Sequence, residues 1–61
     1  MKEGFSDLIN WSDTQLDRVK HLQDVCLDYS LDDEARDILK RLVSIQEQIE
    51  DLSSKAQQMI F

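Results

Sequence analysis

Proline is absent from these 61 residues, and glycine and cysteine occur once each, at Gly4 and Cys26. Without residues that break helices, the chain can stay helical over long stretches. A single cysteine excludes a disulfide within the chain, and His21 is the only other soft ligand, so no structural metal is predicted. No cofactor-binding motif is present either, and we expect no cofactor.

Basic residues and long apolar runs are also scarce. Seven Lys and Arg residues stand against thirteen Asp and Glu, a formal net charge of −6, which repels nucleic acid and anionic membranes at long range. No run of about 18 apolar residues exists to span a bilayer, and the first residues lack the apolar core of a signal peptide. We therefore expect a soluble, cytoplasmic protein that binds neither membrane nor nucleic acid directly, with a basic protein as the more compatible partner.

Hydrophobic residues make up 41% of the chain and charged residues 33%, which is too apolar for a disordered chain. The length predicts one domain over residues 1–61, and a core of this size contributes only about 3–5 kcal/mol. Because disulfides and metals are excluded, self-association or a partner protein is the remaining source of stability.

The second half of the chain carries the strongest pattern. Its apolar residues alternate at spacings of three and four, as in Ala35, Ile38, Leu42, Ile45, Ile49, Leu52, Ala56 and Met59. This heptad pattern predicts one helix over about residues 32–60 with a single apolar seam. Ser30 or Asp32 is its expected N-cap, and the exposed ion pairs expected along it are Asp32–Arg36, Asp37–Arg41 and Asp51–Lys55.

The first half of the chain allows two interpretations around Trp11–Leu16. In one, Ser12 caps a new helix that begins at Asp13, and Gln15 completes a capping box. In the other, a single helix covers about residues 3–29 and Ser12 faces the core. We favour the single helix, because three- and four-residue steps continue through Ser12 along Phe5, Ile9, Ser12, Leu16, Val19, Leu22, Cys26 and Tyr29.

A turn at about residues 29–32 connects the two predicted helices. A connection this short makes them antiparallel, so the predicted fold class is all-α, an antiparallel two-helix hairpin. Two helices share too small a face to cover all the apolar residues of this chain. The simplest closure is a homodimer that forms a four-helix bundle, and the alternative is one hairpin in a hydrophobic groove of another protein.

Several apolar residues fall outside the predicted seam and are expected to form the dimer or partner interface: Trp11, Leu22, Val25, Tyr29, Leu39, Val43, Ile60 and Phe61. Trp11, Tyr29 and Phe61 are the candidate hot spots, because large aromatic side chains dominate interface energies. The sequence equally allows them to cover the ends of the hairpin itself.

Four carboxylates of the first helix, Asp13, Asp17, Asp24 and Asp28, fall within roughly a 60° arc at ~100° per residue. A solvated helix face is the ordinary explanation. The alternative is a mimic of the nucleic-acid backbone that occupies the basic groove of a DNA-binding protein.

No group of residues points to catalysis. Cys26 is expected to be a small core residue and not a redox or acylation site, and His21 a surface residue and not a pH-sensitive contact. The sequence therefore predicts a small, acidic, non-enzymatic protein–protein interaction module, such as a regulator, inhibitor or adaptor. The alternative function is a DNA-mimicking inhibitor of a nucleic-acid-binding protein, acting through the acidic face.

Overall fold

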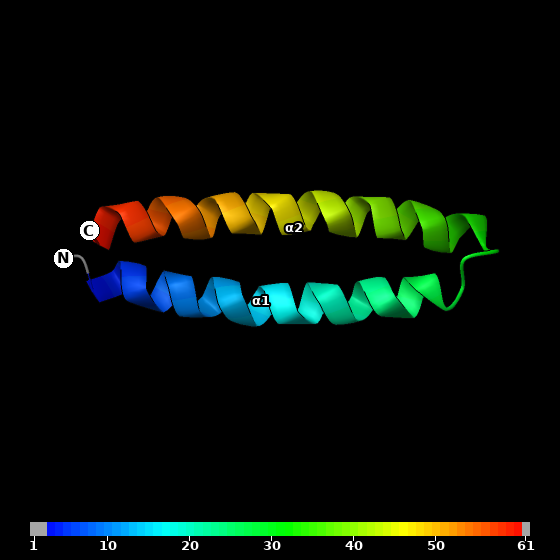
Figure 1. Cartoon of the computed structure of the whole chain (residues 1–61), viewed down its shortest axis with the longest axis horizontal. Coiled ribbons are helices and arrows are strands. Elements are labelled where there is room, and N and C mark those ends of the chain that lie inside the picture. The colour runs from blue at the N-terminus through cyan, green and yellow to red at the C-terminus, as the bar shows by residue number, and fades with distance from the viewer. Residues whose placement is uncertain (1–2, 61) are drawn as a thin grey trace.

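The computed structural model describes residues 3–60, which form two helices. α1 spans Glu3–Leu27 and α2 spans Asp33–Ile60. The helices run antiparallel and side by side, with the start of α1 and the end of α2 level with one another (Figure 1). The predicted all-α, two-helix hairpin is confirmed for these residues, and it is a rod of 47 × 14 × 12 Å.

α1 passes through Ser12 without a break. Ser12 has an exposed fraction of 0%, and its Oγ donates a 2.8 Å hydrogen bond to the carbonyl oxygen of Leu8, one turn earlier. Thr14 makes the same kind of bond to Asn10. A hydroxyl that is bonded to the preceding turn is not placed to cap a new helix. The single-helix interpretation is therefore confirmed, and the capping-box interpretation is wrong.

The turn begins slightly earlier than the sequence suggested, because α1 ends at Leu27 and not at about residue 29. The amide of Asp28 lies 3.2 Å from the carbonyl oxygens of both Asp24 and Val25, and the amide of Tyr29 donates to Cys26 at 3.0 Å. This change from four-residue to three-residue hydrogen bonds tightens the chain and ends the helix. The amide of Asp32 then donates to the carbonyl oxygen of Tyr29 at 2.9 Å and closes the turn.

Asp32 is the N-cap of α2. Its Oδ1 accepts hydrogen bonds from the amides of Glu34 at 2.8 Å and Ala35 at 3.4 Å, which satisfies two amides that have no partner within the helix. Because the carboxylate of Asp32 is used in this way, the predicted Asp32–Arg36 ion pair is wrong, and Arg36 pairs with Asp33 instead.

The other two predicted ion pairs of α2 are present. Arg41 Nε lies 3.1 Å from Asp37, and Lys55 Nζ lies 3.2 Å from Asp51. All three ion pairs are exposed to solvent, so each contributes only a few tenths of a kcal/mol to about 1 kcal/mol. They favour the helical state of α2 and do not indicate a binding site.

The two helices meet along an inner seam, the set of side chains that each turns toward the other. On α2 its members repeat at spacings of four and three, as Ala35, Leu39, Leu42, Gln46, Ile49, Ser53, Ala56 and Ile60. On α1 they are Phe5, Leu8, Ile9, Ser12, Gln15, Leu16, Val19, Gln23 and Cys26. The described residues that this seam buries are small, namely Ser12, Val19, Ser53 and Ala56, and of these only Ser12 is fully buried. The hairpin alone therefore has a thin core.

Half of the seam predicted on α2 is wrong. Ile38, Ile45, Leu52 and Met59 are exposed, and the seam positions expected for them are occupied by Leu39, Gln46, Ser53 and Ile60. The reason lies partly in α1, where Gln23 faces α2 and its Nε2 donates a 2.7 Å hydrogen bond to Oε1 of Gln46. This bond requires α2 to turn a polar residue inward, which leaves a neighbouring row of apolar residues outside.

Candidate protein-interaction surface

α2 carries a row of exposed apolar side chains along nearly its whole length. Ile38, Ile45, Leu52 and Met59 recur at every seventh residue, and each is between 40% and 51% exposed. Residues seven apart lie on one side of a helix, about 10 Å from one to the next. The row is therefore a straight apolar stripe on the outside of the hairpin.

α1 carries four exposed apolar residues: Trp11, Leu22 and Val25 lie on one side of the helix, and Leu27, which is 56% exposed, lies on the opposite side at the end of the helix. Trp11 is 51% exposed, so half of its indole, the largest side chain in the protein, faces water. Between Trp11 and Leu22, this side of α1 carries Arg18, which is exposed, and Gln15, which is half-buried at the edge of the inner seam. On this side of α1, the apolar residues therefore lie toward the two ends of the helix and polar residues lie between them.

The apolar residues of the two helices lie on the same side of the hairpin. At about 100° per residue, Trp11 and Leu22 lie about a quarter turn from the inner seam of α1, and Ile45 and Leu52 about a quarter turn from the inner seam of α2. Because the helices run in opposite directions, these quarter turns point to the same broad face. We call Trp11, Leu22, Val25, Ile38, Ile45, Leu52 and Met59 the outer apolar face.

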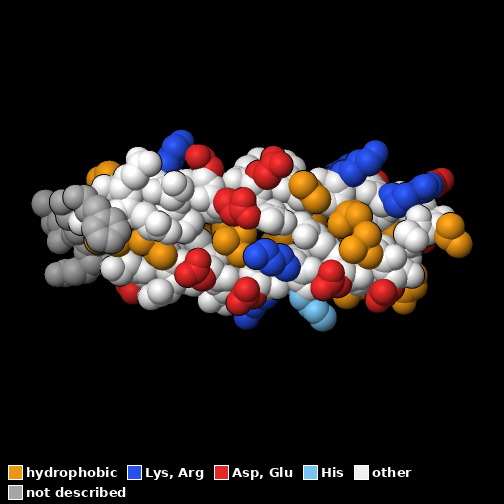
Figure 2. Space-filling view, viewed as in Figure 1, with side chains coloured by type: hydrophobic (Ala, Val, Ile, Leu, Met, Phe, Trp, Pro, Cys, Tyr) orange, Lys and Arg blue, Asp and Glu red, His pale blue; other side chains and the backbone are white. Residues whose placement is uncertain are grey.

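The opposite broad face is charged. Asp13, Asp17 and Asp24 lie on the other side of the α1 seam from Trp11, and they are exposed together with Asp28. Figure 2 views this face and shows acidic side chains in a row along α1, with a basic side chain among them. None of the four aspartates takes part in a salt bridge among residues 3–60. This broad face thus carries most of the acidic side chains of α1, although hydrophobic side chains are also visible on it (Figure 2).

The other residues predicted for the interface are spread over the molecule. Tyr29 is exposed in the turn, and Val43 is exposed on the charged face of α2. Leu39 and Ile60 are half-buried in the inner seam, and Phe61 lies outside the described residues. Of the predicted set, the outer apolar face therefore brings together Trp11, Leu22 and Val25.

Sequence reasoning missed the four residues of the α2 stripe, because it assigned them to the seam inside the hairpin. A signal for them was present. Apolar residues on α2 occupy three adjacent positions of the heptad, which gives an arc wider than one neighbouring helix can cover.

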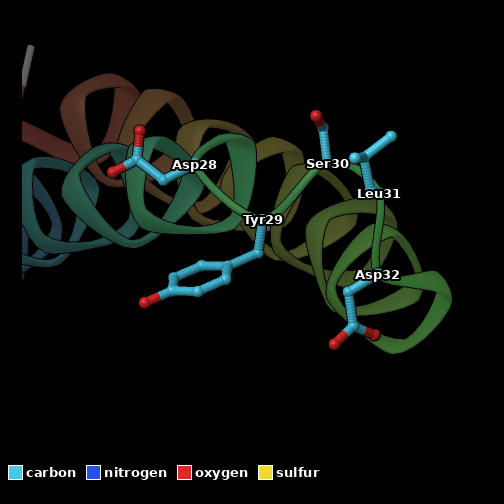
Figure 3. Close-up of a pocket in the computed structure, with 5 residues that line it drawn as sticks. All are labelled: Asp28, Tyr29, Ser30, Leu31 and Asp32. Carbon is cyan, nitrogen blue, oxygen red and sulfur yellow. The ribbon is translucent and has the colours of Figure 1, made fainter.

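Two surface hollows among residues 3–60 do not have the character of a catalytic site. One is lined by Asp17, Arg18, His21 and Leu22, all from a single helix. The other is at the turn, where Figure 3 shows that Ser30 and Leu31 point to one side and Tyr29 and Asp32 to the other, so that the five lining side chains do not converge on one point. A reacting group needs several side chains that converge on it, and these hollows do not provide them.

Cys26 is a free, half-buried thiol of the inner seam, and His21 is exposed on the back of α1. Within the part of the chain that the structure describes, no three His, Cys, Asp or Glu residues are grouped so that they could hold a metal ion. Over the same residues, neither helix is both long enough and apolar enough to cross a bilayer.

Comparison with known proteins identifies no relative of this chain: no family model matches it, and neither does any curated protein or solved structure. The function of the chain is therefore inferred from the surface of the hairpin alone.

Proposed function

We propose that this protein is a small, acidic, non-enzymatic interaction module, a regulator, inhibitor or adaptor that acts by binding protein through the outer apolar face of its hairpin. The observation that carries this proposal is the α2 stripe, four aliphatic side chains that stay 40–51% exposed on one side of a regular helix. Apolar residues that are exposed singly are normal, but a continuous patch marks an interaction site.

The composition of this face fits a protein partner better than a small ligand. Small-molecule sites are concave and enclose most of their ligand, whereas this face is the broad side of a rod 14 × 12 Å in cross-section. A rod with an apolar stripe is the shape that packs against other helices. Trp11 is the expected hot spot, because a half-exposed indole loses the most water-accessible surface when a partner covers it.

Dimerisation into a four-helix bundle is part of the proposal. The thin inner seam of one hairpin contributes little stability, and a second layer of helices on the outer apolar face would convert its exposed stripe into a core. A protein partner bound in addition to the second copy would then meet the charged faces, and the net charge of −6 favours a basic one.

The test uses two aliphatic residues that are equally exposed but lie on opposite faces of the hairpin. Ile45 and Val43 are each 43% exposed, Ile45 on the outer apolar face and Val43 on the charged face. Wild type, Ile45→Asp and Val43→Asp are compared for self-association and for protein captured from the source cell, with circular dichroism as the check on helicity. Ile45→Asp is expected to lose binding and Val43→Asp to keep it. Equal binding by all three would contradict the proposal.

The second candidate is a DNA-mimicking inhibitor that uses Asp13, Asp17, Asp24 and Asp28. It is supported by the exposure of these four carboxylates, which are free of salt bridges within residues 3–60; the first three lie along one side of α1, and Asp28 is at the start of the turn that follows. Its affinity for a nucleic-acid-binding protein should fall steeply with added salt and after replacement of the four aspartates by asparagine. Binding that is indifferent to both changes would exclude this function.

A further inference from the structure

We propose that a second copy of this chain covers the outer apolar face, with α1 packed on α1 and α2 packed on α2 of the partner, antiparallel, so that the two turns lie at opposite ends of the bundle. This inference rests on the proposed function, which includes a dimer, and adds how the second copy is oriented on the face.

The exposed area of the hairpin fits a second copy. The chain exposes 4904 Å², whereas a compact monomer of 7.2 kDa exposes about 4100 Å². The excess of about 800 Å² arises from the rod shape, in which each helix has only one neighbouring helix. A second hairpin packed along the rod would bury an area of this order, since one partner contributes about 800 Å² to an interface of standard size. A second hairpin of equal length can cover this face along its whole length.

The α2 stripe is symmetric about its own midpoint, which lies between Ile45 and Leu52, next to Gln48. An antiparallel copy of α2 therefore places Ile45 beside the partner's Leu52 and Ile38 beside the partner's Met59. Each aliphatic side chain of the stripe meets another aliphatic one. Each copy contributes the same residues to the contact, as a two-fold interface requires.

The part of this side of α1 from Trp11 to Leu22 is symmetric in the same way, whereas Val25 lies beyond it. The midpoint of the ladder from Trp11 to Leu22 lies between Gln15 and Arg18. An antiparallel copy of α1 places Trp11 beside the partner's Leu22, and Gln15 beside the partner's Arg18. The guanidinium of Arg18 can donate to the side-chain carbonyl oxygen of Gln15, so that the polar centre is matched by a polar centre.

A single two-fold axis can relate α1 to the partner's α1 and α2 to the partner's α2. The start of α1 and the end of α2 are level (Figure 1), and the rise per residue is the same in both helices. Counting inward from these ends brings the midpoint of the α1 ladder to within about one turn of the midpoint of the α2 stripe. The two antiparallel contacts can therefore form at the same time.

The other face-to-face arrangement packs α1 on the partner's α2. It would place Gln15 and Arg18 against the middle of the partner's aliphatic stripe, near Ile45 and Leu52. A buried guanidinium without a partner is costly, so this arrangement is disfavoured. At the rim of the proposed contact, Arg41 and Lys55 of opposite copies come close, but each is already paired with a carboxylate of its own helix, at 3.1 and 3.2 Å.

The experiment uses the full chain with Cys26 replaced by alanine, so that one introduced cysteine is the only thiol. Gln48→Cys lies next to the proposed two-fold axis, and Glu47→Cys is the matched control at the same level on the charged face. Sedimentation of the Cys26→Ala protein gives the mass, and oxidation followed by non-reducing electrophoresis reports cross-linking. We expect twice the mass of 7.2 kDa, nearly complete cross-linking of Gln48→Cys, and little cross-linking of Glu47→Cys.

Each other outcome overturns a defined part of the inference. A dimer in which Gln48→Cys and Glu47→Cys cross-link equally slowly overturns the antiparallel orientation. A single-chain mass with full helicity overturns the second copy as occupant. The proposed function survives that result if Val43→Asp binds a protein other than this chain and Ile45→Asp does not. It fails if neither substitution changes any binding.

Discussion

Ser12 shows how a polar residue comes to be the most deeply buried side chain of this hairpin. Its hydroxyl is satisfied by the carbonyl oxygen of Leu8 within the same helix, so its burial leaves no donor unpaired. Its small size allows α2 to lie close at this level, where a longer side chain would hold the helices apart. The residue thus contributes through its volume more than through its hydrogen bond.

Substitutions at Ser12 test this view. Ser12→Ala removes only a local hydrogen bond and should change the free energy of unfolding by less than about 1 kcal/mol. Ser12→Leu should lower it by about 1–3 kcal/mol, because the added atoms overfill the inner seam. Urea unfolding followed by circular dichroism measures both changes. Thr14→Leu is the matched control, since Thr14 makes the same backbone bond but is exposed, and a loss at Thr14 equal to that at Ser12 would contradict the argument.

Asp32 gives a second prediction at this scale. Its Oδ1 accepts two amide hydrogen bonds at the start of α2, and the loss of such a cap costs about 1 kcal/mol. Asp32→Ala should therefore lower the free energy of unfolding by this amount, and Asp32→Ser should restore most of it. Asp33→Ala, which removes only the exposed ion pair with Arg36, should change stability by less than about 0.5 kcal/mol. Equal effects of Asp32→Ala and Asp33→Ala would show that charge matters here and capping does not.

At the scale of the elements, the hydrogen bond between Gln23 and Gln46 fixes how the helices face one another. A polar pair in an otherwise apolar seam favours one register over its neighbours, at some expense of stability. Replacing both glutamines by leucine should raise the free energy of unfolding by about 1–2 kcal/mol. It should also let α2 rotate toward its aliphatic stripe, which would lower the exposure of Ile45.

The exposure of Ile45 can be followed by the labelling rate of Ile45→Cys in a protein without Cys26. Labelling should slow when Gln23 and Gln46 are both leucine. The single variants Gln23→Leu and Gln46→Leu are the controls, because each leaves one amide unpaired in the seam and should be less stable than the double variant. If the double variant is no more stable than wild type and labels at the same rate, the pair does not set the rotation of α2.

The sequence was sufficient to predict both helices, the short turn and the antiparallel hairpin, because heptad spacing and capping residues are local signals. It was not sufficient to predict which side of α2 faces α1. Ala35, Leu42, Ile49 and Ala56 belong both to the predicted seam and to the observed one. The two seams differ at the positions between them, where the prediction chose the apolar Ile45 and Leu52 and the structure has the polar Gln46 and Ser53. The choice depends on the side chains that α1 presents, Gln23 and Ser12 among them, and no pattern within α2 contains that information. For the same reason the α1 part of the outer apolar face was predicted and the α2 part was missed.

At the scale of the whole molecule, the hairpin is extended. Its radius of gyration is 14.2 Å, against about 10.5 Å for a compact domain of this length. A rod of two helices has one internal contact for each helix, whereas a helix in a four-helix bundle has two neighbours. In the proposed dimer the second neighbour of each helix packs on the outer apolar face, so stability and binding would depend on the same side chains.

This dependence predicts that thermal stability rises with protein concentration. If folding and dimerisation are coupled, each tenfold increase in concentration stabilises the dimer by about 1.4 kcal/mol, which raises Tm by roughly 5 °C for a dimer of this size. Calorimetry over a hundredfold range measures the shift, and the Gln48→Cys dimer, once cross-linked in the Cys26→Ala background, should lose it because its two chains no longer separate. Ile45→Asp should lose the shift as well and melt at a lower temperature, whereas Val43→Asp, equally exposed on the opposite face, should keep the wild-type slope. A Tm that does not vary with concentration in the wild type would mean that the inner seam alone holds the hairpin together, and the outer apolar face would then be free for a partner other than this chain.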